Sequence, residues 1–161
     1  MNLPVIFRIL GVLLMLFSFS MLPPLLVSVY YNDGVMYSFL TTFFLTLLSG
    51  FILWAPVMRN RRELKTRDGF LVVTLFWTVL GSFGSFPFIF TSSLGMSVTD
   101  SFFESISGLT TTGATVLSGL DDLPKSILYY RQQLQWLGGM GIIAIAVAIL
   151  PMLGIGGMQL Y

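Results

Sequence analysis

The chain has 161 residues, a net charge of +1 and neither cysteine nor histidine. Only 9% of its residues are charged, against about 25% in a soluble domain, and the mean hydropathy is +0.88. A soluble domain of this size would need a far larger polar surface, so the composition predicts a membrane protein. It excludes disulfides, thiolate or histidine catalysis and the common zinc sites, and the near-zero net charge argues against a nucleic-acid partner.

Two apolar stretches come first in the chain. A helix crosses a hydrocarbon layer about 30 Å thick with roughly 20 apolar residues, and the ranges 3–30 and 36–58 reach that length. The first is interrupted near its end by Pro23 and Pro24. It is longer than a signal-peptide core of roughly 7–15 residues. We therefore expect two leading transmembrane helices, with a basic loop after them, in residues 1–68.

The loop "RNRRELKTR" (residues 59–67) indicates how the chain is oriented. It carries five basic residues against one acidic residue, Glu63, and lies between two predicted spans. Short basic loops beside spans stay in the cytoplasm, so we expect this loop and the N-terminus, near Arg8, on the cytoplasmic side. The loops on the other side begin with tyrosines suited to an interfacial belt: Tyr30, Tyr31 and Tyr37.

Residues 69–161 contain two further apolar stretches, at 70–90 and 127–150. The second carries one charge, Arg131, in its first turns. Small residues recur on one face of each stretch, which allows close helix approach with or without a pore: Thr74, Thr78, Gly81 and Ser85, then Gly141, Ala144 and Ala148 after Leu137. The segment Gly138–Gly141 places weak helix formers in mid-span and permits a bend, for which a gating role is a hypothesis.

A short amphipathic helix is predicted at 98–109, in the long, acidic outer connection between these two spans. Either Ser97 with Asp100 or Ser101 with Glu104 can cap its N-terminus, and both carboxylates are interpreted as helix-start charges. The helix is half as long as a span. If it enters the membrane from outside, its C-terminal end points towards the bilayer centre and favours a cation.

The segment "TTTGAT" (110–115) follows this helix and is too rich in threonine and glycine to continue it. Bare backbone is tolerated at membrane depth only when it is buried in protein or lines a water-filled path, and backbone carbonyls can replace the hydration shell of a cation. The segment lacks carboxylates for a Ca²⁺ or Mg²⁺ cage. The alternative is an ordinary extracellular loop. The candidate ligands, through their carbonyl oxygens, are Thr110, Thr111, Thr112 and Gly113.

The motifs "FFESISGLTTTGAT", "ILYYRQQLQWLGGMGII" and "AILPMLGIGGMQLY" resemble the membrane subunit of the bacterial Trk potassium uptake system, the TrkH/TrkG type of the Trk/Ktr/HKT superfamily. The resemblance runs along the whole chain. It implies an all-α polytopic membrane protein with two leading transmembrane helices followed by one pore repeat: a transmembrane helix (70–90), a re-entrant pore helix (98–109), a filter loop (110–115) and a transmembrane helix (127–150).

The resemblance also implies a function and partners. It implies potassium uptake in the bacterial cytoplasmic (inner) membrane, with Gly113 as the filter glycine and Thr110, Thr111 and Thr112 lending carbonyls to K⁺. Some plant relatives have serine at that glycine and favour sodium. Family subunits pair as homodimers and are gated by a cytosolic nucleotide-binding subunit, TrkA. No organic cofactor is implied.

Family members carry four such repeats in one polypeptide, and this sequence holds one. Three alternatives stay open: the chain is a fragment whose other three repeats follow, several copies assemble, or it does not conduct. The competing function is a non-conducting assembly or regulatory module in the membrane. An enzyme is the weakest hypothesis, because no nucleophile is paired with a base.

Overall fold

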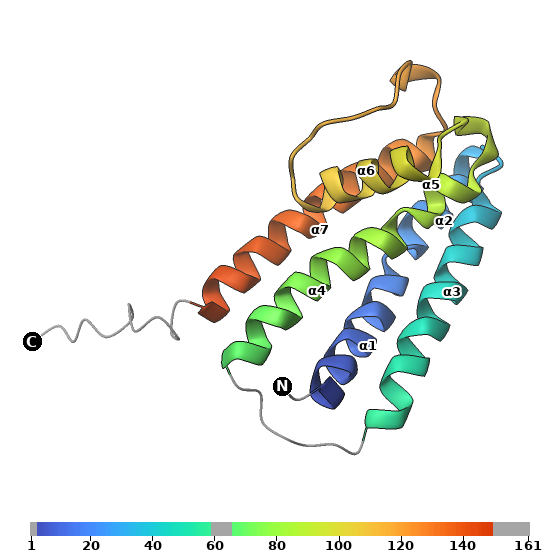
Figure 1. Cartoon of the computed structure of the whole chain (residues 1–161). Coiled ribbons are helices and arrows are strands. Elements are labelled where there is room, and N and C mark those ends of the chain that lie inside the picture. The colour runs from blue at the N-terminus through green and yellow to red at the C-terminus, as the bar shows by residue number, and fades with distance from the viewer. Residues whose placement is uncertain (1–2, 59–65, 150–161) are drawn as a thin grey trace, which may run out of the picture.

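The computed structural model describes residues 3–58 and 66–149, except for the side chains of 66–70 and 144–149. Within these residues every regular element is a helix (Figure 1). The predicted all-α fold is therefore confirmed. The basic loop that indicated orientation falls mostly outside the described residues.

The first predicted span is two helices, α1 (Leu3–Phe19) and α2 (Leu22–Tyr31). Pro23 and Pro24 stand in the first turn of α2, where a missing N–H costs nothing. An unbroken helix through this region would lose backbone hydrogen bonds at both prolines. The interruption that Pro23 and Pro24 mark in the sequence is a break at residues 20–21, just before them, and α1 and α2 together make one membrane-crossing segment.

Helix α3 (Met36–Trp54) packs along α1, and the short η1 (Ala55–Val57) follows it. The two helices approach each other closely at Gly11 and Gly50. A Cβ on Gly11 would stand 2.7 Å from the Gly50 carbonyl oxygen, and a Cβ on Gly50 would stand 2.8 Å from the Gly11 carbonyl oxygen. Backbone-to-backbone packing of this kind holds helices together in lipid, where apolar burial gives little driving force.

The second half of the chain contains α4 (Thr66–Gly84), α5 (Phe86–Phe90), α6 (Val98–Leu109) and α7 (Lys125–Ile149). The short helices η2 (Ser92–Leu94) and η3 (Leu120–Asp122) lie in its connections. The predicted span 70–90 is broken at Ser85, with Pro87 in the first turn of α5. Helix α6 has the bounds predicted for the short helix.

Three segments among the described residues are long and apolar enough to cross a membrane: 3–31, 36–57 and 71–90. The predicted fourth span, 127–150, coincides with α7 (Lys125–Ile149), and its last part, 144–150, lies outside the residues whose side chains the structure describes. The first half of α7 is rich in charged and amide side chains: Lys125, Arg131, Gln132, Gln133 and Gln135.

Two uncharged side chains of α7 donate hydrogen bonds to backbone carbonyls at the breaks in the other helices. The Tyr130 hydroxyl donates to the Gly84 carbonyl, 2.8 Å away, where α4 gives way to α5. The Gln133 Nε2 donates to the Ser20 carbonyl, 2.7 Å away, where α1 gives way to α2. A buried carbonyl without a donor is costly. The polar half of α7 therefore replaces hydrogen bonds that the broken helices have lost.

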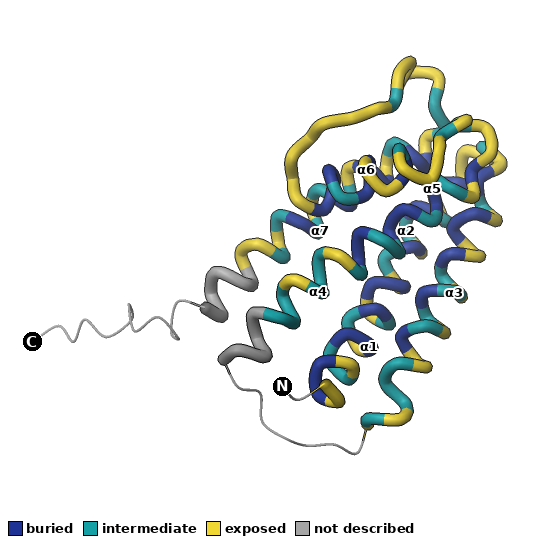
Figure 2. The backbone as a smooth tube through the Cα atoms, in the orientation of Figure 1, coloured by how far each residue is buried: buried dark blue, intermediate teal, exposed yellow. Residues whose placement is uncertain are grey.

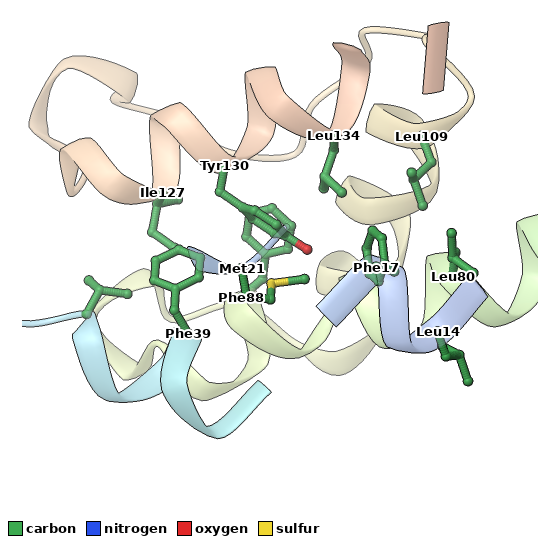
Figure 3. Close-up of a cluster of buried hydrophobic side chains, with 11 residues drawn as sticks. Leu14, Phe17, Met21, Phe39, Leu80, Phe88, Leu109, Ile127, Tyr130 and Leu134 are labelled. Carbon is green, nitrogen blue, oxygen red and sulfur yellow. The ribbon is translucent and has the colours of Figure 1, made fainter. Parts of the chain in front are cut away.

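The core lies where all the long helices meet. Figure 3 shows Tyr130 between Ile127, Phe39 and Phe88. The remaining labelled side chains of this buried cluster are Leu14, Phe17, Met21, Leu80, Leu109 and Leu134.

Gly138 is a point of close contact between α7 and the end of α6. A Cβ there would stand 1.9 Å from the Leu109 carbonyl oxygen, a distance that no real contact allows. The sequence permits a bend at Gly138–Gly141. In the structure α7 continues through this segment as one helix, and Gly138 allows the close approach to α6.

Figure 1 gives the course of the chain. The start of α1, the end of α3 and the start of α4 lie at one end of the bundle. Helix α6 starts at the opposite end and runs inward beside α7, and the chain then returns to that opposite end before α7 begins.

Candidate functional site

Helix α6 begins with a capping box. The Ser97 hydroxyl accepts from the Asp100 backbone N–H at 3.1 Å, and the Asp100 carboxylate accepts from the Ser97 N–H at 3.4 Å. The sequence allowed two N-caps, Ser97 or Ser101, and the structure has the first. Because the cap satisfies donors that the first turn leaves free, the helix starts at a fixed residue.

Helix α6 ends in a Schellman motif with an unusual residue. The Thr112 N–H donates to the Ser107 carbonyl and the Thr111 N–H to the Gly108 carbonyl, both at 3.0 Å. This motif needs a left-handed residue, usually glycine, but here it is Thr111, with φ of 57°. A strained backbone of this kind costs roughly 1–3 kcal/mol and is found mostly at functional sites.

The three threonine hydroxyls of the segment bond within it or to α6. Thr110 Oγ1 donates to the Ile106 carbonyl at 2.8 Å, and Thr111 Oγ1 donates to the Thr110 carbonyl at 2.7 Å. The hydroxyls of Thr110 and Thr112 lie 2.8 Å apart. Gly113 follows with φ of 76°, a conformation that resists side chains. The hydroxyls thus stiffen the turn from inside.

The four predicted ligands, Thr110 to Gly113, lie together in one exposed turn (Figure 2). Among the described residues, no donor contacts the carbonyl oxygens of Thr112 and Gly113. The same part of the chain contains no group of three His, Cys, Asp or Glu that could hold a metal ion. The oxygens of this turn are therefore backbone carbonyls and threonine hydroxyls, without a carboxylate.

Glu104 has a role that the sequence did not indicate. It is 3% exposed, and its carboxylate accepts from Arg131 Nε of α7. It also accepts from the Thr115 hydroxyl, 3.0 Å from both oxygens, and from the Val116 N–H at 3.1 Å. We call Glu104, Arg131, Thr115 and Val116 the Glu104 network. The interpretation of Glu104 as a helix-start charge is wrong, because the side chain lies in the second turn and is buried between α6 and α7.

One further contact joins the loop to α6. The Ser107 hydroxyl donates to the Ala114 carbonyl at 2.6 Å. With the Schellman motif before residue 112 and the Glu104 network after residue 114, the turn is held on both sides. The chain between these anchor points is only a few residues long.

The sequence held a signal for this network. Arg131 is the lone charge in a predicted span, and a buried charge needs a partner. Nothing in the sequence alone said which carboxylate pairs with it, since Asp100, Glu104, Asp121 and Asp122 all lie in the preceding connection. The pairing follows from the angle at which α6 lies against α7.

The fold and the site together define a class: a multi-pass helical membrane protein in which a short helix, packed between longer helices, ends in an exposed, strained and hydroxyl-rich turn. Residues 36–161 match the family model TrkH, described as a cation transport protein. The chain belongs to this family.

Relatives with related names cover nearly the whole chain. It is 64% identical over 156 residues to the Trk system potassium uptake protein TrkH of Vibrio parahaemolyticus, covering 97% of this chain and 32% of that protein. It is 60% identical to TrkH of Escherichia coli over 100% of this chain and 33% of that protein, and 42% identical to TrkG of the same organism over 94% and 31%. The chain spans about a third of the length of these relatives.

A solved structure agrees with the fold. The crystal structure of the potassium transporter TrkH from Vibrio parahaemolyticus matches with a TM-score of 0.92 at 61% identity, covering 99% of this chain and 34% of that one.

Proposed function

We propose that this chain forms part of a potassium permeation pathway for K⁺ uptake, in which the turn at residues 110–113 binds dehydrated K⁺ through backbone carbonyls. The names of its relatives support potassium as the substrate. Residues 69–161 then form one pore repeat, with α6 as the pore helix and residues 110–115 as the filter loop. Residues 1–68 supply the two leading transmembrane helices.

The observation that carries this proposal is the turn itself. Thr111 is held in a strained left-handed conformation, and the carbonyls of Thr112 and Gly113 accept no hydrogen bond within the described chain. The turn lies at the C-terminal end of α6, where the helix dipole places partial negative charge. Free carbonyls, a favourable dipole and a stiff backbone are what a site for a desolvated cation requires.

A single turn cannot surround an ion. The pathway therefore needs three more pore repeats, from the rest of a longer chain or from other copies. We further propose that the assembled subunit pairs as a homodimer and is regulated by a cytosolic nucleotide-binding subunit of the TrkA type. The transport step itself uses no organic cofactor.

We place the chain in the bacterial inner membrane with its N-terminus in the cytoplasm. The tyrosines at the α2–α3 connection support the position of the opposite interface, because Tyr30, Tyr31 and Tyr37 are 83%, 58% and 72% exposed. Amphipathic rings of this kind lie at the level of the lipid headgroups. Apolar side chains that point outward along the helices suit lipid contact: Leu16, Leu26, Leu48 and Ile52.

The direct test is Gly113→Ser, made in a complete transporter in which this chain replaces the matching segment of the Vibrio parahaemolyticus TrkH. The hydroxymethyl group strains the backbone at φ 76° and shifts the carbonyls. We expect the ratio of potassium to sodium uptake to fall, while Ser118→Ala, on the exposed loop further on, leaves it unchanged. An unaltered ratio in Gly113→Ser would contradict the filter assignment.

The second candidate is a non-conducting membrane module, favoured by the exposure of the whole turn. Cysteine substitution at Thr112 separates the two. In an ion pathway, K⁺ should protect the thiol from a reagent added outside. Free modification that is insensitive to K⁺ would favour the module.

A further inference from the structure

The Glu104 carboxylate lies where three segments of the chain meet. Glu104 belongs to α6, Thr115 and Val116 belong to the loop leaving the turn, and Arg131 belongs to α7. The turn at residues 110–113 joins α6 directly and reaches Thr115 two residues after its end. Glu104 therefore connects the chain just after the turn with the helix just before it.

A carboxylate is an expensive way to pack two helices together. Glu104 and Arg131 are 3% and 9% exposed, and the loss of hydration by a buried ion pair can exceed the attraction between its charges. An apolar residue of similar size would pack α6 on α7 without that cost. What the carboxylate adds is a fixed acceptor for one hydroxyl and one backbone N–H of the loop.

The loop contacts define the outgoing limb of the turn. The Val116 N–H and the Thr115 hydroxyl both donate to Glu104, and the Thr115 hydroxyl accepts from the Leu117 N–H at 3.1 Å. Three consecutive residues thus take their position from one side chain. A backbone fixed at residues 115–117 and at the end of α6 leaves few conformations for the carbonyls between them.

The charges also balance. Arg131 brings a buried positive charge to the loop that follows the turn, and a bare cation there would oppose K⁺ binding. Its contact with Glu104 makes the pair neutral. One carboxylate therefore serves both the geometry of the loop and the electrostatics beneath it.

We propose that Glu104 is a positioning residue for ion selectivity: its carboxylate, neutralised by Arg131, holds Thr115 and Val116 so that the carbonyls of residues 110–113 keep the spacing that discriminates K⁺ from Na⁺. This inference rests on the proposed function of the turn. It predicts that selectivity, and not only the amount of folded protein, depends on Glu104.

The test uses Glu104→Gln and Thr115→Val in the complete chimeric transporter described above. Initial uptake of K⁺ and of Na⁺ is measured in cells and divided by the amount of protein in the membrane. The control is Asp100→Asn, the same chemical change one turn earlier on α6, where the side chain only caps the helix.

We expect the uptake ratio of potassium to sodium to fall about tenfold in Glu104→Gln, as for a lost hydrogen bond to a charged group, and about threefold in Thr115→Val. Asp100→Asn should keep the ratio. If Glu104→Gln does not reach the membrane, Thr115→Val decides, because it removes one donor and leaves the ion pair in place.

Lower total uptake with an unchanged ratio in these variants would reduce Glu104 to a structural residue and overturn the inference. Gly113→Ser distinguishes a failure of the positioning role from a failure of the proposed function of the turn. If it shifts the ratio while Thr115→Val and Glu104→Gln do not, only the positioning role fails. If Gly113→Ser also leaves the ratio unchanged, the proposed function of the turn itself fails.

Discussion

Two carboxylates hold α7 in place, and they do so in different surroundings. Glu104 joins α6 and the loop after the turn to the second turn of α7, with Arg131 as its cationic partner. Asp33 joins the α2–α3 connection to the start of α7, accepting from the Ser126 N–H at 3.0 Å. Both carboxylates connect segments of the chain that are far apart in the sequence.

The difference lies in burial and charge. Glu104 is nearly inaccessible and is paired with an arginine, whereas Asp33 is half-buried and accepts only from uncharged donors, including the Ser28 hydroxyl and the Val35 N–H at 3.2 Å. A helix N-terminus stabilises a carboxylate that retains some water, but a carboxylate without water needs a full countercharge. The degree of burial therefore determines whether each carboxylate requires a cationic partner or only uncharged donors.

The largest effect is expected from Arg131→Gln. It leaves Glu104 buried without its countercharge, which should cost about 3–5 kcal/mol. Thermal unfolding in detergent measures the loss. The double variant Arg131→Gln with Glu104→Gln should recover part of it, because no isolated charge remains. A double variant that is less stable than Arg131→Gln alone would mean that burial does not govern this region.

A smaller effect is expected from Gly138→Ala, in the same buried region. The added methyl meets the Leu109 carbonyl, and overpacking of this kind costs about 1–3 kcal/mol. Gly139→Ala is the matched control, since nothing lies within 4 Å of a Cβ at that position. It should be neutral or slightly stabilising in a helix. Equal losses of thermal stability in the two variants would argue against the close contact between α6 and α7.

The smallest effect is expected from Asp33→Asn, about 1 kcal/mol for weakened hydrogen bonds near solvent. Burial raises the pKa of Asp33, but hydrogen bonds from Ser126, Ser28 and Val35 outweigh it and hold the pKa below the ordinary 3.8. The stabilisation from Asp33 should therefore be complete above that ordinary value and be lost as the pH falls through the lowered pKa.

Unfolding of the parent chain and of Asp33→Asn, measured between neutral and acidic pH, tests this pH dependence. The stability difference between the parent chain and Asp33→Asn should shrink as the pH drops below the ordinary pKa of aspartate. A difference that stays constant with pH would show that the Asp33 charge does not contribute to the contact between the α2–α3 connection and α7.

Local chemistry explains what could be predicted from the sequence. Helix α6 was predicted with its observed bounds because the signals for its start and its end, Ser97 with Asp100 and then Gly108, are local in the sequence. The interruption near Pro23 and Pro24 could be predicted from the sequence, whereas the break at Ser85, which Pro87 marks, was not predicted. Apolar length alone cannot distinguish one long helix from two short ones whose free carbonyls find donors elsewhere.

The nonlocal contacts could not be predicted. Glu104 and Arg131 are 27 residues apart, and Asp33 and Ser126 are 93 apart. Their pairing depends on how the helices pack. The composition predicts that the helix ends before residues 110–113, but it does not predict the left-handed Thr111, because glycine is the usual residue there.

The polar contacts on α7 have a mechanical consequence. Between its start and Gln133, α7 forms hydrogen bonds to four other parts of the chain: Ser126 to Asp33, Tyr130 to Gly84, Arg131 to Glu104, and Gln133 to Ser20. Sliding the helix by one residue, about 1.5 Å, would break all four contacts together. This half of α7 can only travel with the bundle as a rigid body, so any independent tilt must begin beyond Gln133.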